Sequence, residues 1–199
     1  MPKISARLRR TTLATALLVA LSAGSGFVSA GPAAAVTTTF ADSFESPVIH
    51  VDFVDYLAGQ QFGPWKVVSG SVDLTTDWQH AQGRQSLDLN GSDPGAVSHV
   101  VPTTLLTTYR VTYALAANPD AGQAIRTGNV KVNGQLLDSF SFDSTGKTVS
   151  NMGWVYRTFY FTNTLAASAD LQFASTTPSA WGPVIDDVRV ESCLLVLCL

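Results

Sequence analysis

Apolar and polar residues alternate along most of this chain. Across residues 109–117, apolar side chains fall on every second position, with arginine and threonine between the first of them. A period of two is typical of a half-buried β-strand, whereas an α-helix repeats every 3.6 residues. Shorter runs at 49–53 and 86–89 alternate in the same way. The pattern therefore predicts antiparallel strands.

Turn residues separate these apolar runs. Asn133-Gly134 stands between two of them, and Asn-Gly is the strongest short signal for a β-hairpin. Other clusters of Gly, Pro, Asn and Ser lie at 69–71, 92–95, 118–122 and 177–179. About nine strands with such turns predict an all-β fold, an antiparallel β-sandwich or jelly roll. We expect one such domain over residues 38–191.

The first 35 residues have the features of a signal peptide. Four of the 12 basic residues lie in the first ten positions. An apolar stretch follows at 11–21, too short for the roughly 20 residues that span a bilayer. Small residues after it fit cleavage after Ala30 or after Ala35. We expect a secreted, extracellular protein with no membrane span in its mature part.

Charge and motifs exclude several functions. The chain has 15 acidic residues, none of them in the basic first ten positions, so the remainder is acidic and is not suited to nucleic acid. Motifs for serine nucleophiles, zinc or phosphate binding are absent from the sequence. We therefore expect no enzyme. A glycan-active hydrolase with a carboxylate pair is the less favoured alternative.

Six short segments resemble one known family. They are residues 43–47, 69–74, 85–91, 118–120, 151–154 and 182–188. Their sequence and order are similar to those of DUF642 proteins and, more closely, of the bacterial choice-of-anchor C domain. The resemblance implies an extracellular jelly roll like galactose-binding domains, related to carbohydrate-binding modules and to plant cell-wall proteins.

One carboxylate is expected on the apolar side of the last strand. Asp186 shares its parity with Val184 and Val188, and a buried charge needs a partner. Similar carbohydrate-binding sandwiches hold a structural calcium between their first and last strands, and Glu45 and Asp186 match those ligand positions. The alternative is a carboxylate that accepts backbone N–H bonds or pairs with Arg189.

Aromatic residues carry the signal for a ligand. Trp78 and Trp181 fall in polar, turn-rich segments, and flat aromatic rings stack on sugar rings. His80 lies near Trp78, and Tyr156 shares a strand face with Tyr160. We expect Trp78, Trp181, Tyr156 and His80 to contact a polysaccharide or glycoconjugate. The alternative is that the tryptophans belong to the core and that a second layer covers the tyrosines.

The chain ends in an apolar tail, residues 192–199, which holds both cysteines. In an exported protein, Cys193 and Cys198 are expected to be oxidised. An intramolecular bridge requires the four residues between them to bend, because two linked Cα atoms lie within about 7 Å. Pairing between two molecules is the alternative.

Export, the absence of catalytic motifs and the aromatic residues together favour one interpretation. We expect a secreted, non-catalytic carbohydrate-binding module, or a module of the cell envelope or matrix. The alternative is a purely structural extracellular β-sandwich without a soluble ligand.

The cleavage hypothesis predicts the N-terminus of the exported protein. Because basic, apolar and small-residue regions follow in the order of a signal peptide, the mature chain should begin at Gly31 or Val36. N-terminal sequencing of the protein from the culture medium measures this directly. Recovery of an intact Met1 only from the cytosol would contradict the prediction.

Overall fold

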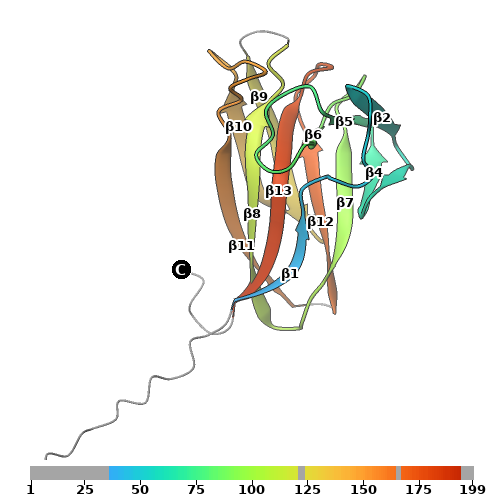
Figure 1. Ribbon diagram of the computed structural model, residues 1–199. Coiled ribbons are helices and arrows are strands. Elements are labelled where there is room, and N and C mark those ends of the chain that lie inside the picture. The colour runs from blue at the N-terminus through green and yellow to red at the C-terminus, as the bar shows by residue number, and fades with distance from the viewer. Residues whose placement is uncertain (1–35, 121–123, 165–166, 194–199) are drawn as a thin grey trace, which may run out of the picture. The chain divides into compact units, whose positions relative to one another are not determined.

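The strands form two antiparallel sheets that face each other (Figure 1). The computed structural model describes residues 36–120, 124–164 and 167–193. The seven-stranded sheet consists of β1 (Thr37–Asp42), β2 (Phe53–Leu57), β5 (Ser71–Thr75), β6 (Ser86–Asp88), β8 (Thr107–Ala117), β11 (Val155–Asn163) and β13 (Pro183–Cys193). The six-stranded sheet consists of β3 (Gln61–Phe62), β4 (Trp65–Ser69), β7 (Ala96–Pro102), β9 (Ile125–Val132), β10 (Gln135–Asp143) and β12 (Ser168–Ser175).

The predicted all-β antiparallel sandwich is confirmed. The described residues form thirteen strands, more than the roughly nine that the alternation indicated. The run at 86–89 corresponds to β6, whereas the run at 49–53 lies before β2, which begins only at Phe53. β3 has two residues and is too short to show a period. The predicted signal peptide and Cys198 lie outside the described residues, so the cleavage site and the bridge from Cys193 stay predictions. Within the described ranges, no helix is long and apolar enough to cross a membrane.

The order of strands joins distant parts of the chain. The seven-stranded sheet runs β11-β8-β13-β6-β5-β2, and β1 pairs with β13 as well. The first and last described strands therefore lie side by side (Figure 1). The six-stranded sheet runs β10-β9-β12-β7-β4-β3. This arrangement places β2, β5 and β6 together at one edge of the seven-stranded sheet.

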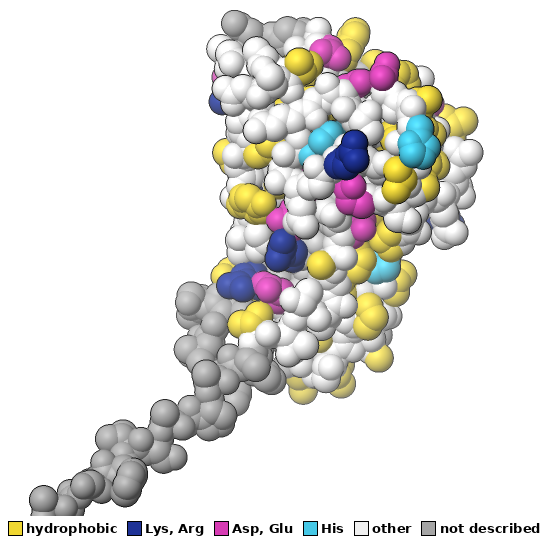
Figure 2. All heavy atoms as spheres, viewed as in Figure 1, with side chains coloured by type: hydrophobic (Ala, Val, Ile, Leu, Met, Phe, Trp, Pro, Cys, Tyr) yellow, Lys and Arg dark blue, Asp and Glu magenta, His cyan; other side chains and the backbone are white. Residues whose placement is uncertain are grey.

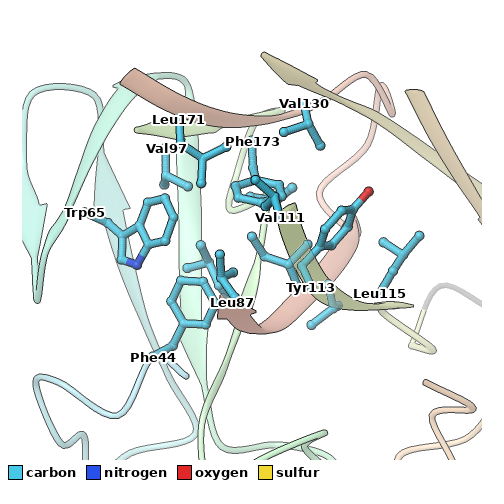
Figure 3. Close-up of a cluster of buried hydrophobic side chains, with 14 of the residues drawn as sticks. Phe44, Trp65, Leu87, Val97, Val111, Tyr113, Leu115, Val130, Leu171 and Phe173 are labelled. Carbon is cyan, nitrogen blue, oxygen red and sulfur yellow. The ribbon is translucent and has the colours of Figure 1, made fainter. Parts of the chain in front are cut away.

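The core lies between the sheets and is rich in aromatic rings (Figure 3). Trp65 on β4 stacks on Phe44 at a ring distance of 5.6 Å and contacts Phe173 edge-on at 6.0 Å. The indole Nε1 of Trp65 donates a hydrogen bond of 2.7 Å to Asp42 Oδ2 on β1. Trp65 therefore connects the two sheets through both packing and a hydrogen bond.

Alternation fails in the second half of β8. Tyr113 and Leu115 point into the core, and the alanines at 114, 116 and 117 are fully buried as well. The loop with Gln82 covers the outer face of the seven-stranded sheet there, because the N–H of Gln82 bonds to Asp186, which lies opposite Ala114.

Removal of the Trp65 side chain from the core should lower stability strongly. Trp65→Ala should lower the free energy of unfolding by about 3–5 kcal/mol, because it leaves a cavity and removes the donor to Asp42. Urea unfolding followed by circular dichroism measures the change. Trp181→Ala, at an exposed loop position, is the control and should cost less than about 0.5 kcal/mol. Equal losses in the two variants would contradict this account of the core.

Candidate functional site

Three aspartates form a row across the outer face of the seven-stranded sheet. Asp55 on β2 lies opposite Asp73 on β5, and Asp73 lies opposite Asp88 on β6. The neighbours Leu74 and Leu87 on the same strands point into the core. Successive side chains of a strand alternate between its faces, so the three carboxyl groups lie on the outer side. Like charges on directly opposite positions are unfavourable, which marks the row as unusual.

Loops from four parts of the chain surround this row and leave a cleft of about 290 Å³. Its lining combines acidic, small and aromatic residues: Phe53, Asp55, Asp73, Thr75, Asp77, Trp78, Asp88, Gly91, Ser92, Asn118, Asp120, Ala180 and Trp181. Acidic groups and aromatic rings in one concave site are typical of ligand recognition through hydrogen bonds and ring stacking.

Asp88 lies at the base of the cleft and is only 1% exposed. Its Oδ1 accepts a hydrogen bond from the backbone N–H of Asn90 at 2.9 Å. Its Oδ2 accepts one from Asn118 Nδ2 at 2.8 Å and a longer one from the N–H of Gly182 at 3.4 Å. A side chain at position 182 would collide with Asp88 and Asn90, so glycine is required there. The carboxylate thereby fixes three loops of the cleft.

Asp73 lies in the middle of the row, and its environment disfavours a negative charge. Partial burial is the main cause, followed by the charges of Asp55 and Asp77, and together they raise the pKa of Asp73 to about 7. Its Oδ1 is buried and has no hydrogen-bond partner. Burial likewise raises the pKa of Asp88 to about 7, against the effect of its three donors.

The two predicted tryptophans differ in their exposure. Trp181 is 43% exposed and lies at the cleft, where its ring is accessible to a ligand. Trp78 also lines the cleft but is only 7% exposed, and its Nε1 donates to Ser86 Oγ at 2.9 Å. Trp78 is therefore part of the wall and not an open platform. Phe53 on β2, which the sequence analysis did not select, is 54% exposed at the same cleft.

His80 and Tyr156 do not line this cleft. His80 lies 3.0 Å from Ser86 Oγ through its Nδ1 and lines a second hollow of about 640 Å³ with Glu45 and Arg84. Figure 2 shows histidine, basic and acidic side chains close together on the face in view. Burial lowers the pKa of His80. Tyr156 is 58% exposed on β11, and its hydroxyl donates to Asp187 Oδ2 at 2.9 Å.

Glu45 and Asp186 hold the same loop from two sides. Glu45 Oε1 accepts backbone N–H bonds from Arg84 at 2.8 Å and Gln85 at 2.9 Å. Asp186 Oδ2 accepts one from Gln82 at 2.8 Å, while its Oδ1 accepts the N–H of the next residue at 2.7 Å. For Asp186, these contacts match the alternative to calcium binding, in which backbone N–H groups donate to the buried carboxylate.

The parity argument for Asp186 is wrong, although Asp186 is fully buried. A bulge after Asp186, with Asp187 at a φ of 45°, shifts the register of β13 against β8. Asp186 therefore lies opposite Ala114 on the covered outer face, whereas Val190 lies opposite Val111 in the core. Arg189 pairs with Asp187 at 2.9 Å and not with Asp186.

A calcium ion at Glu45 and Asp186 stays a prediction. Calcium needs six to eight oxygen ligands, roughly, so carbonyl groups and water would have to complete the two carboxylates. Among the described residues, no group of three or more His, Cys, Asp or Glu side chains is placed to hold a metal ion. Burial raises the pKa of Asp186 to about 7, so a bound cation would have to favour the ionised form.

Sequence reasoning missed the aspartate row, although a signal was present. Four of the six segments that carry the family resemblance lie at this cleft: 69–74, 85–91, 118–120 and 182–188 contribute or adjoin Asp73, Asp88, Asn118 and Trp181. Segments far apart in the chain thus meet at one place. That convergence depends on strand pairing and could not be seen in any single segment.

The chain belongs to the DUF642 family, described as a protein of unknown function, whose model matches residues 41–191. Halomucin of Haloquadratum walsbyi is 30% identical over 131 residues, which is 63% of this chain. The chain spans only about 1% of the length of halomucin.

Several solved structures that resemble this chain are described as carbohydrate-binding modules. The CBM22-1 xylan-binding domain from Paenibacillus barcinonensis Xyn10C has a TM-score of 0.50 and 20% identity, and covers 80% of this chain and 97% of that domain. A family 35 carbohydrate-binding module from Clostridium thermocellum has a TM-score of 0.48 and 16% identity. This match covers 79% of this chain and 97% of that module. The similarity to the xylan-binding domain confirms the predicted jelly roll.

The buried acids predict how stability depends on pH. The folded form keeps protons on Asp73, Asp88 and Asp186 up to pH values near 7, whereas the unfolded chain releases them near the ordinary pKa of 3.8. The free energy of unfolding should therefore fall as the pH rises from about 4 to about 7. Urea unfolding across this range measures the slope.

A variant tests whether part of this pH dependence of stability comes from the cleft. Asp73→Asn removes one of the three groups without changing the shape of the side chain, so it should flatten the pH dependence. Asp170→Asn, on β12 of the other sheet, should leave the slope unchanged. A free energy of unfolding that rises throughout this range would contradict the role given to burial.

Proposed function

We propose that this domain is a non-catalytic carbohydrate-binding module of a secreted protein, with the acidic cleft beside Trp181 as its glycan site. The observation that carries the proposal is the accessible indole at a concave site lined by hydrogen-bonding groups. The apolar face of a sugar ring packs on such an indole, while its hydroxyl groups donate to carboxylates. The family membership and the fold shared with the xylan-binding domain support this proposal.

The cleft supports binding better than hydrolysis. A glycosidase needs two carboxyl groups that both reach the scissile bond, one as an acid and one as a base or nucleophile. Asp88 is 1% exposed and accepts three hydrogen bonds from the protein, so it cannot approach a substrate. Asp73 and Asp55 lie on adjacent strands in direct opposition, without room between them for a sugar.

The glycan site predicts opposite behaviour of two tryptophan variants. Trp181→Ala should abolish binding and leave the melting temperature nearly unchanged, because the ring is exposed. Trp78→Ala should lower the free energy of unfolding by about 3–5 kcal/mol, because its ring is buried. Affinity gel electrophoresis with a panel of polysaccharides measures binding, which we expect in the micromolar to millimolar range.

Two results would contradict the proposal. One is a Trp181→Ala variant that is retarded by every polysaccharide as strongly as the wild type. The other is a wild-type domain that none of the polysaccharides retards. In the second case the protein is better described as a structural module of the cell envelope or matrix.

A second proposal concerns structural calcium at Glu45 and Asp186, which the resemblance to carbohydrate-binding sandwiches implies. An ion bound only by the folded state adds its binding free energy to stability, so the melting temperature should be higher in millimolar calcium than in EDTA. Glu45→Gln keeps an oxygen for the loop N–H groups but removes the charge, so it should abolish the difference. Identical melting curves in calcium and EDTA would contradict a calcium site.

A further inference from the structure

The charges around the cleft all have one sign. Five aspartates lie among its lining residues, and none of the described lining residues is Lys, Arg or His. Asp88 lies at the base, whereas Asp55, Asp77 and Asp120 are exposed at the rim. A concave surface with acids alone repels anionic ligands and raises the local concentration of cations. Carboxylate-bearing sugars are therefore disfavoured here.

One buried oxygen atom of the aspartate row lacks a donor. Asp73 lines the cleft, and its Oδ1 has no hydrogen-bond partner among the described residues. Asn90 Oδ1 also lacks a partner, but Asn90 is completely buried and does not line the cleft. A buried acceptor without a donor is costly, and a ligand in the cleft that donates a hydrogen bond to Asp73 would satisfy it.

The donor suited to this site is an organic ammonium group. It carries a positive charge and three N–H donors, so it can bond several acceptors at once. The Trp181 ring adds a cation–π surface at the same cleft. A divalent metal ion fits less well, because no group of three acidic, histidine or cysteine side chains is arranged for metal binding in the described part of the chain.

We propose that the cleft selects glycans with free primary amino groups, such as oligomers of hexosamine that are not N-acetylated. This inference rests on the proposed glycan-binding function and specifies its ligand class. The ammonium group is recognised by the aspartate row around Asp73, and the sugar ring by Trp181. An N-acetyl group in the same position removes the charge and two of the donors.

Calorimetric titration with matched oligosaccharides tests this selection. The ligands are a glucosamine oligomer, the same oligomer after N-acetylation, a neutral gluco-oligosaccharide and an oligogalacturonate, all at a pH near 7, where Asp73 is in part ionised and the amines are in part protonated. We expect the glucosamine oligomer to bind about tenfold more tightly than its N-acetylated form, since hydrogen bonds to charged groups are the stronger ones. Added salt should weaken the binding of the glucosamine oligomer and leave that of the neutral oligosaccharide unchanged.

Variants locate the selection in the cleft. Asp73→Asn should remove the tenfold preference, so that the glucosamine oligomer and its N-acetylated form bind with similar affinity. Asp170→Asn makes the same substitution on the other sheet and should keep the preference. Thermal melting of both variants confirms that they are folded.

Several outcomes would overturn the inference while leaving the glycan function intact. These are equal binding of the N-acetylated oligomer, tightest binding of the oligogalacturonate, or a preference that survives Asp73→Asn. Binding of a lysine oligomer as tight as that of the glucosamine oligomer would overturn recognition of the sugar, and competition by millimolar calcium chloride would assign the site to a metal ion. Absence of binding to every oligosaccharide would instead contradict the proposed function itself.

Discussion

The buried carboxylate of Asp88 is the interaction on which the candidate site depends. A carboxylate without water needs several donors, and Asp88 obtains them from Asn90, Asn118 and Gly182, which belong to three separate loops. The short strand β6 places this group beside β5 and β13. The loops that define the cleft are thus held by one side chain at its base. The burial of Asp88 explains both the shape of the cleft and the raised pKa of this carboxyl group.

The same geometry separates structural from accessible groups. Asp88 and Trp78 are buried and bonded to the protein, so they form the wall. Trp181, Phe53 and Asp55 remain exposed around it. A site with a rigid base and an accessible aromatic rim can bind a sugar without a large ordering cost. The second hollow near Glu45 has charges of both signs and lacks an aromatic ring among its lining residues other than histidine, so it is less suited to sugar stacking.

Much of the fold could be predicted from the sequence, because alternation reports directly on a half-buried strand. Residues 109–117 predicted β8 in this way. The site could be predicted only in part. Trp181 was recognised from its loop, but the aspartate row depends on which strands pair, and that information is not local. Asp186 shows a second limit, because a single bulge at Asp187 exchanges the two faces of β13. Counting alternate residues predicted correctly that Asp186 is buried, but it placed the side chain on the wrong face of the sheet.

The central claim is that a glycan occupies the cleft beside Trp181. An NMR titration of the isotope-labelled domain with the tightest-binding oligosaccharide tests it most directly, because each amide reports on its own surroundings. The account predicts that the indole N–H of Trp181 and the amides of Gly91, Ser92 and Asn118 shift together, with a common dissociation constant. Shifts confined to the hollow around His80 and Arg84, or to the face of Tyr156, would contradict it.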